Sequence, residues 1–161
     1  MESFNIKLLS KSSRLSVPIE ITIKPVTVNA YCSGEWIYDK KLEGQCDEDK
    51  CALLYLHGGA YHSGSTKTHR LITIPMAKRG ASFGLKVLCI NYRLAPRHKF
   101  PCALDDAIDA LSFLYSEVSP RKVAVMGDSA GGGLSLATCL RAWQLGMEYI
   151  HSNNISNIHS Y

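Results

Sequence analysis

A chain of 161 residues with 46% hydrophobic and 20% charged residues is long enough for one globular domain with a buried core. Its net charge of +4 is modest and its basic residues are scattered, so it lacks the basic stripe of a nucleic-acid-binding surface. No segment approaches the roughly 18 apolar residues of a membrane span, and the N-terminus lacks the apolar core of a signal peptide, so we expect a cytoplasmic protein.

Cysteine and histidine residues show no metal-ligand spacing. Cys46 and Cys51 flank a short acidic run, but no second ligand pair accompanies them, and the histidines do not repeat at ligand spacing. Cys89 and Cys139 fall within apolar segments, where a thiol serves as a small core residue. We therefore predict that the protein needs neither a metal ion nor another cofactor.

Residues 1–50 are predicted to form an N-terminal segment with two strands. Residues 19–24 alternate apolar and polar side chains, as a half-exposed strand does, and Pro25 should end or offset that strand. A second extended stretch is predicted near residues 26–37, followed by an acidic loop around residues 43–50.

Strands and helices alternate over residues 51–146, which we predict to form the core of the domain. Apolar runs predict buried strands, and helical periodicity predicts the segments between them. The predicted strands cover residues 51–56, 85–91 and 123–126, and the predicted helices cover residues 66–83, 103–117 and 130–146. This alternation predicts an α/β fold with parallel strands, right-handed crossovers and a site at the carboxyl ends of the strands.

Spacing within the helices predicts which side chains face the core. In the first helix we expect Leu71, Ile72 and Met76 to face inward. In the last helix we expect a buried stripe that includes Leu134 and Leu140.

The chain reads Gly127-Asp128-Ser129-Ala130-Gly131 between the last predicted strand and the last predicted helix. Gly-x-Ser-x-Gly in that setting predicts a sharp turn that lifts the serine side chain clear of the backbone, with glycine on either side because nothing larger fits. The amide after the serine lies at a helix start, where anions are stabilised. We therefore identify Ser129 as a candidate nucleophile and the Ala130 amide as a candidate oxyanion donor. The alternative is a flexible glycine turn.

A second glycine-rich stretch, His57-Gly58-Gly59-Ala60, directly follows the predicted strand at residues 51–56. Consecutive glycines let the backbone approach a ligand closely, so the amides of Gly58 and Gly59 are candidates to donate to the same oxyanion. His57 has an alternative role as a general base, but in this motif we expect it to orient the loop.

Four motifs recur in a fixed order along the core: residues 57–60 (HGGA), 91–96 (NYRLAP), 100–107 (FPCALDDA) and 127–132 (GDSAGG). In order and spacing the chain resembles the hormone-sensitive-lipase branch of the α/β-hydrolases over residues 51–146. That branch includes carboxylesterases and arylacetamide-deacetylase-like enzymes. The loop ends in Ala60 where the family usually has glycine. The resemblance implies the N-terminal portion of an α/β-hydrolase fold, with the two strands of residues 1–50 as outer antiparallel strands.

The resemblance also implies a chemistry. An ester and water would give an acid and an alcohol through an acyl-Ser129 intermediate, with a small-molecule ester as the substrate. Asp128 would belong to the elbow rather than serve as the acid of a catalytic triad. Asp105 and Asp106 would offset the dipole at a helix start, and Arg93 would pair with a loop carboxylate.

The chain departs from this family after Ser129. In this fold the triad acid and then the histidine follow the serine, yet no aspartate follows Ser129, and residues 147–161 form a polar tail unlike the family. His151 and His159 lie in that tail, where neither packing nor an acid would orient them. We therefore predict a C-terminally truncated hydrolase that lacks the triad Asp and His and has little activity.

Two other functions are compatible with these residues. The fold is similar to that of plant hormone receptors that keep the pocket and lack the catalytic histidine, so the chain would be a non-catalytic ligand-binding protein. Alternatively, it is a regulatory fragment that pairs with a complete relative. A central strand at residues 123–126 without its later neighbours would have an unpaired edge, which favours self-association.

Overall fold

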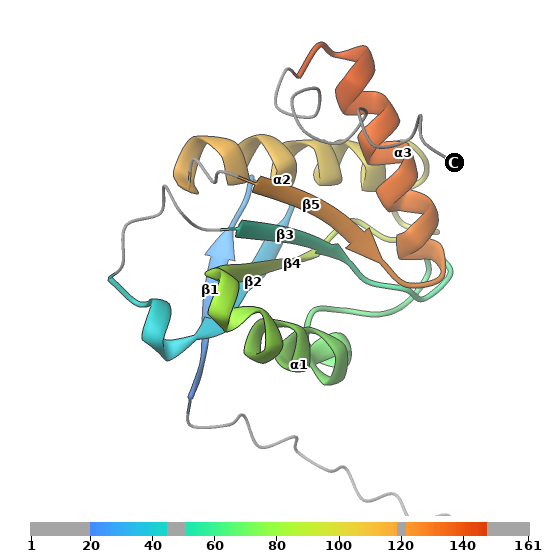
Figure 1. Ribbon diagram of the computed structural model, residues 1–161. Coiled ribbons are helices and arrows are strands. Elements are labelled where there is room, and N and C mark those ends of the chain that lie inside the picture. Colours follow the sequence, from blue (N-terminus) through green and yellow to red (C-terminus); the bar gives the residue numbers. More distant parts are fainter. Residues whose placement is uncertain (1–19, 45–50, 119–121, 148–161) are drawn as a thin grey trace, which may run out of the picture.

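Five strands lie in one mixed sheet, with helices on both of its faces (Figure 1). This computed structural model describes residues 20–44, 51–118 and 122–147. The strands are β1 (Ile21–Thr27), β2 (Ser33–Asp39), β3 (Cys51–Leu56), β4 (Leu85–Asn91) and β5 (Lys122–Gly127). The helices are α1 (Arg70–Gly80), α2 (Cys102–Val118) and α3 (Ala130–Gln144), with short 3-10 helices η1 (Lys40–Leu42), η2 (Lys67–His69) and η3 (Ala81–Phe83).

The strand order across the sheet is β1-β2-β4-β3-β5. β3 pairs in parallel with both β4 and β5, while β2 pairs antiparallel with β1 and β4. The predicted combination of outer antiparallel strands and a parallel core is therefore confirmed. β3 and β4 begin and end where the sequence predicts them, and β5, α2 and α3 agree to within two residues.

The predicted end of the first strand at Pro25 is wrong. β1 passes through Pro25, which pairs with Glu35, and ends at Thr27, so β2 starts at Ser33 rather than near residue 26. Among the described strands β1 lies at the edge of the sheet, so one side of its backbone has no neighbour from that set to bond. A residue without an N–H is tolerated at such a position.

Alternation along the strands divides the core into two layers. The layer beneath α2 and α3 contains Leu54, Leu56, Leu88, Ile90, Leu111, Leu114 and Leu134. The layer beneath α1 contains Leu53, Tyr55, Ile74, Ala77, Val87 and Cys89. Figure 1 shows α1 on one side of the sheet and α2 and α3 on the other, so both faces of β3 and β4 are covered.

α1 turns a different face toward the sheet from the predicted one. Ile74 and Ala77 are buried, and Met76 packs against their cluster as expected. Leu71 is 67% exposed and Ile72 is 37% exposed, so the expectation that these two face inward is wrong. Pro75 lies within the helix and has no N–H for the carbonyl of Leu71. Water can replace a donor lost in this way, which favours placing the Leu71 side of the helix in solvent.

α3 also presents an unexpected face. Its buried residues are Gly131, Leu134, Ser135, Thr138 and Ala142. The burial of Leu134 agrees with the prediction, but the predicted burial of Leu140 is wrong, because that side chain is 54% exposed. The inward face consists mostly of small residues because the helix starts very close to the sheet. A pattern of hydrophobic residues along the sequence does not contain this constraint.

Candidate active site

The backbone turns sharply between β5 and α3. β5 ends at Gly127 and α3 begins at Ala130, and Ser129 between them has φ +50° and ψ −120° with an exposed side chain. A positive φ is unfavourable for a residue with a Cβ, and such strain clusters at functional sites. The structure thus has the strained strand-to-helix turn that the sequence predicts around Ser129.

Gly127 and Gly131 make this turn sterically possible. A Cβ on Gly127 would lie 2.4 Å from the Leu56 carbonyl oxygen, and one on Gly131 would lie 2.0 Å from that same oxygen. Both distances are far shorter than real Cβ contacts, so only glycine lets α3 start this close to the end of β3.

The loop after β3 contains three consecutive residues with positive φ. These are Gly59 at +121°, Ala60 at +56° and Tyr61 at +60°. A Cβ on Gly59 would lie 2.2 Å from the Ser63 carbonyl oxygen, so glycine is required there. The Gly59 carbonyl accepts from the N–H groups of His62 and Ser63 at 2.9 Å each, which closes the turn.

The three predicted oxyanion donors differ in their surroundings. The Gly58 N–H donates to Oδ1 of Asp128 at 2.9 Å. Because this N–H is already hydrogen bonded to the carboxylate, it is not free to donate to an oxyanion, which was its predicted role. The amides of Gly59 and Ala130 donate to nothing else in the described part of the chain, and the same is true of the Ala60 amide, which the sequence reasoning did not consider.

His57 is completely buried and is held by the loop and by the residue after β4. Its Nδ1 lies 2.8 Å from the Gly58 carbonyl oxygen, which can only accept, so Nδ1 carries the proton. The ring stacks on Tyr92 with centroids 4.3 Å apart, and the Tyr92 hydroxyl donates to the His57 carbonyl at 2.5 Å. Burial lowers the pKa of His57, so the ring is neutral in the folded protein.

Asp128 has contacts that no sequence motif indicates. In addition to the Gly58 N–H, its Oδ1 accepts from the Tyr55 hydroxyl at 2.8 Å, and His69 Nε2 lies 3.5 Å away. Tyr55 is 73 residues from Asp128, and its alternation in β3 predicts only that it faces one side of the sheet. Tyr55 and His69 are therefore the residues of this site that sequence reasoning missed.

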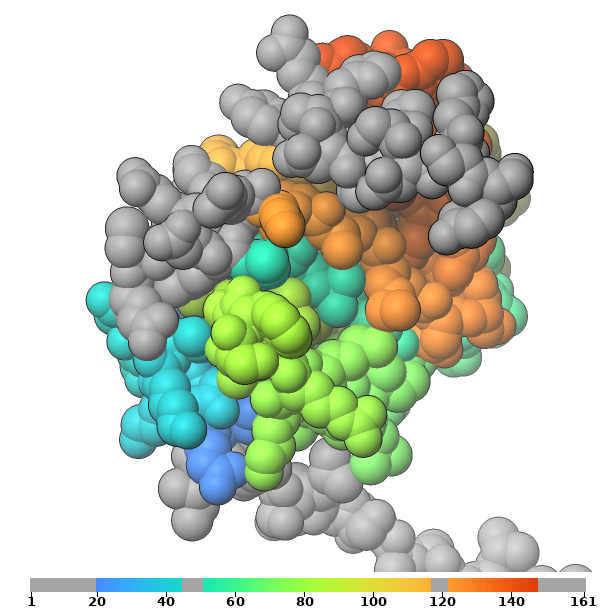
Figure 2. Space-filling view, in the orientation of Figure 1, coloured from blue at the N-terminus to red at the C-terminus, as the bar shows by residue number. Residues whose placement is uncertain are grey.

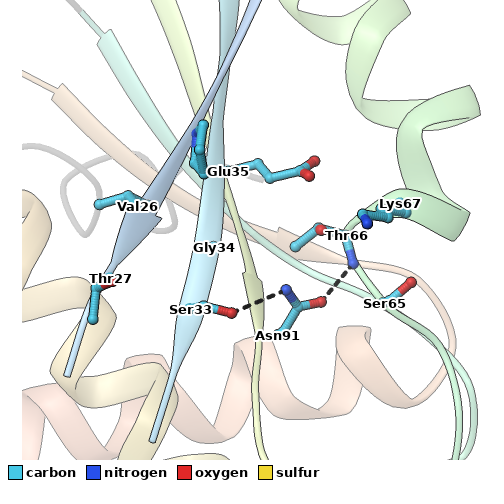
Figure 3. Close-up of a pocket in the computed structure, with 10 residues that line it drawn as sticks. Val26, Thr27, Ser33, Gly34, Glu35, Ser65, Thr66, Lys67 and Asn91 are labelled. Atoms are coloured by element: carbon cyan, nitrogen blue, oxygen red, sulfur yellow. Dashed lines mark hydrogen bonds between the residues drawn. The ribbon is translucent and has the colours of Figure 1, made fainter. Parts of the chain in front are cut away.

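The far end of the loop is fixed by the last residue of β4. Oδ1 of Asn91 accepts from the Thr66 N–H at 2.9 Å, and its Nδ2 donates to Ser33 Oγ at 3.3 Å (Figure 3). Figure 3 shows these residues around a pocket of about 700 Å³ bordered by β1, β2 and the segment Ser65, Thr66 and Lys67. None of the predicted site residues lines that pocket.

Two acidic residues at the start of α2 behave differently. Asp106 is fully buried and accepts from the Arg93 N–H at 2.8 Å and from its guanidinium at 2.8 Å and 3.0 Å. Asp105 is exposed in the first turn of α2. Arg93 thus pairs with a carboxylate, but that carboxylate is Asp106 of α2 and not one in a loop, and the predicted role at the helix dipole fits Asp105 alone.

A smaller pocket of about 330 Å³ lies beside the glycine-rich loop. Its lining includes Tyr61 of the loop, Leu104 of α2 and Leu134 of α3, and most of it is apolar. Among residues 20–44, 51–118 and 122–147, no group of three or more His, Cys, Asp or Glu side chains is placed to hold a metal ion. Within those ranges no helix has the length and apolar character needed to cross a membrane.

Known proteins resemble the chain in sequence. The family model for the alpha/beta hydrolase fold matches residues 53–153. An acetyl-hydrolase of Streptomyces hygroscopicus is 38% identical over 113 residues, which cover 70% of this chain and 34% of that protein. An ethyl acetate hydrolase of Pseudomonas putida is 44% identical over 94 residues, which cover 55% of this chain and 28% of that protein.

The chain also resembles a solved structure of a hormone-sensitive lipase from a metagenome library. The TM-score is 0.70 at 30% sequence identity, and the match covers 83% of this chain and 42% of that one. The chain spans less than half the length of each of these three relatives.

Proposed function

Because the chain belongs to the α/β-hydrolase fold family, we propose that Ser129 is the nucleophile of a carboxylic-ester hydrolase site. The observation that carries this proposal is the backbone of Ser129, with φ +50° and ψ −120° in an exposed turn between β5 and α3. The protein keeps a strained residue where the fold could relax it with glycine, which favours a functional reason for the serine. The hydrolase names of the relatives support the same chemistry.

The proposed oxyanion donors are the amides of Gly59 and Ala130. Neither amide has another partner in the described residues, and Ala130 is the first residue of α3, where the helix dipole stabilises negative charge. The Gly58 amide is left out of this set because Asp128 occupies it. His57 is proposed as a structural residue whose neutral ring holds the Gly58 carbonyl.

The apolar pocket of about 330 Å³ beside Tyr61 supports a small-molecule substrate with an apolar group. We propose a small carboxylic ester, which an acyl-Ser129 intermediate would divide into an acid and an alcohol. No cofactor is needed for this reaction, since the attacking hydroxyl and the amides belong to the protein.

The described residues place no proton acceptor beside Ser129. No described histidine has a hydrogen bond with Ser129, and His151 and His159 lie outside the described residues. Loss of the base in a serine triad lowers turnover on the order of a million-fold, while oxyanion donors and binding retain roughly a thousand-fold over water. We therefore propose that this chain hydrolyses esters only slowly.

Hydrolysis of p-nitrophenyl acetate by the purified chain tests the proposal, with Ser129→Ala as the control. The expected result is slow release of p-nitrophenol that disappears in the variant. Equal release from both proteins contradicts the nucleophile assignment. Saturable binding of the ester without any release supports the non-catalytic ligand-binding alternative instead.

We also propose that the chain associates with a second copy of itself through β5. Within the described residues β5 pairs with β3 alone, so its other edge has unbonded backbone groups. Met126 is 47% exposed and borders a groove of about 700 Å³ with Leu71 and Ile72 of α1. Figure 2 shows this side, with α1 in green and β5 in orange flanking β3 in teal.

Helix α3, on the other face of the sheet from α1, also has an exposed apolar surface. Leu136, Leu140 and Trp143 of α3 are each more than half exposed and follow a spacing of four and three residues, which puts them on one face of the helix. Pairing of β5 with β5 of a second copy would bring these stripes together. Such a contact satisfies the strand edge and buries apolar surface in one step.

A further inference from the structure

Both backbone hydrogen-bonding groups of Gly58 have a partner. Its N–H donates to Asp128 Oδ1 at 2.9 Å, and its carbonyl accepts from His57 Nδ1 at 2.8 Å. A Cβ on Gly58 would lie 2.2 Å from Asp128 Oδ2, so the carboxylate lies directly against this glycine. The Gly58 carbonyl shares one peptide plane with the Gly59 N–H, so the orientation of the Gly59 amide depends on how both groups of Gly58 are held.

The carboxylate of Asp128 is itself held in place. The Tyr55 hydroxyl donates to Oδ1 from β3 at 2.8 Å, and Tyr55 is 1% exposed, so its ring cannot swing away without opening the core. His69 Nε2 of η2 also lies 3.5 Å from Oδ1. One oxygen atom therefore joins β3, the glycine-rich loop and the segment before α1.

Charge strengthens these contacts at neutral pH. Desolvation acts to raise the pKa of Asp128, but the hydrogen bonds from Tyr55 and Gly58 outweigh it and hold that pKa below its usual range. Burial raises the pKa of Tyr55, so its hydroxyl keeps its proton and donates. Hydrogen bonds to an ionised acceptor are roughly twice as strong as those between neutral groups.

We propose that Asp128 is a positioning residue, whose carboxylate clamps the Gly58 N–H and, together with the His57 contact to the Gly58 carbonyl, holds the Gly59 amide in place relative to Ser129. This inference rests on the proposed function. Asp128 directly precedes Ser129, so a single hydrogen bond connects the loop with the oxyanion donor to the turn with the nucleophile. A misplacement of about 1 Å at such a site lowers a rate about 100-fold, so the clamp controls reactivity without touching the substrate.

Two readouts on Asp128→Ala and Asp128→Asn test the clamp. The first is hydrogen exchange of the Gly58 amide by NMR, which reports the hydrogen bond directly. The second is the rate at which a p-nitrophenyl phosphonate reacts with Ser129, because the phosphoryl oxygen needs the same amides as the ester oxyanion. Asp39→Ala is the matched control, since Asp39 Oδ1 also accepts a backbone N–H, that of Lys41, away from the site.

Asp128→Ala should speed exchange of the Gly58 amide and slow phosphonylation of Ser129 at least tenfold, at a temperature where the variant is folded. Asp128→Asn should restore most of both, because its amide oxygen still accepts from Gly58 and Tyr55. Asp39→Ala should change neither. The proposal is overturned if Gly58 exchange in Asp128→Ala matches the unsubstituted chain, or if exchange rises while phosphonylation does not slow. If Ser129 does not react even in the unsubstituted chain, the proposed function fails alone, and Gly58 exchange still decides whether the clamp exists.

Discussion

Replacing Gly131 by alanine should destabilise the protein, although alanine is the better helix former. A Cβ at this position would lie 2.0 Å from the Leu56 carbonyl oxygen and 2.7 Å from that of His57. Real Cβ contacts are essentially never shorter than 3.0 Å, so the start of α3 must move by about 1 Å away from β3. The atoms it meets are backbone carbonyls at the end of a central strand, which cannot rotate away as a side chain can.

The size of the effect follows from two opposing contributions. Overpacking of this kind costs about 1–3 kcal/mol, and the gain in helix propensity from Gly to Ala returns about 1 kcal/mol at most. Because the clash is with backbone, we expect the upper part of that range and a net loss of about 1–2 kcal/mol. For a chain of this length such a loss lowers Tm by roughly 2–8 °C.

Gly132→Ala is the matched control, one residue further along the same helix. A Cβ there would lie 3.4 Å from the Gly127 carbonyl oxygen, which is an ordinary contact. This substitution should stabilise the protein by up to about 1 kcal/mol through helix propensity alone. Urea unfolding followed by circular dichroism measures both variants. A Gly131→Ala variant as stable as Gly132→Ala would refute the close approach of α3 to β3.

Three further substitutions and conditions test other parts of the structure. Asp106→Ala should lower the free energy of unfolding in urea by about 3–5 kcal/mol, because it leaves the Arg93 charge without its buried partner. At the exposed Asp105 the same substitution should change that free energy by no more than about 0.5 kcal/mol. Equal effects would contradict the buried pair. Burial lowers the pKa of His57 from 6.5, so the unfolded chain binds a proton at this ring more readily than the folded chain does. The contribution of His57 to the free energy of unfolding should therefore be complete above about pH 6.5 and decrease as the pH falls below it. A free energy of unfolding that stays constant from pH 8 to 5 would contradict a buried neutral ring. Met126→Lys should shift sedimentation from dimer toward monomer by placing a charge beside the β5 edge, and a monomeric unsubstituted chain would contradict the proposed self-association.

The positions of the strands were predictable because their sequences are unambiguous. β3 is an uninterrupted apolar run, and β4 is one apart from Lys86 and its last residue, Asn91. Their length of six and seven residues suits a buried strand better than a helix. The turn around Ser129 was equally predictable. Its two glycines, Gly127 and Gly131, are required because a Cβ on either would collide with the Leu56 carbonyl oxygen.

The inward faces of two helices were not predictable from periodicity. Leu71 and Leu140 are large and apolar, so a pattern based on hydrophobicity assigns them to the core, yet both are more than half exposed. Pro75 in α1 and the close start of α3 at Gly131 decide the faces instead. Both depend on backbone contacts that a one-dimensional pattern does not contain.

The site was predictable as a set of motifs but not as a set of contacts. The sequence brings Gly58 and Asp128 to the carboxyl ends of adjacent strands, and it does not say which way the Gly58 N–H points. That direction depends on the backbone dihedral angles of the loop. The contribution of Tyr55 was hidden for a similar reason, because an aromatic residue in a buried strand is most often simply core.

The most direct test of the central claim is to identify the residue that reacts with a p-nitrophenyl phosphonate by peptide mass spectrometry of the treated chain. The account predicts one phosphonyl adduct, on Ser129, which is absent from Ser129→Ala. An adduct on another residue that persists in Ser129→Ala, with none on Ser129, would contradict it.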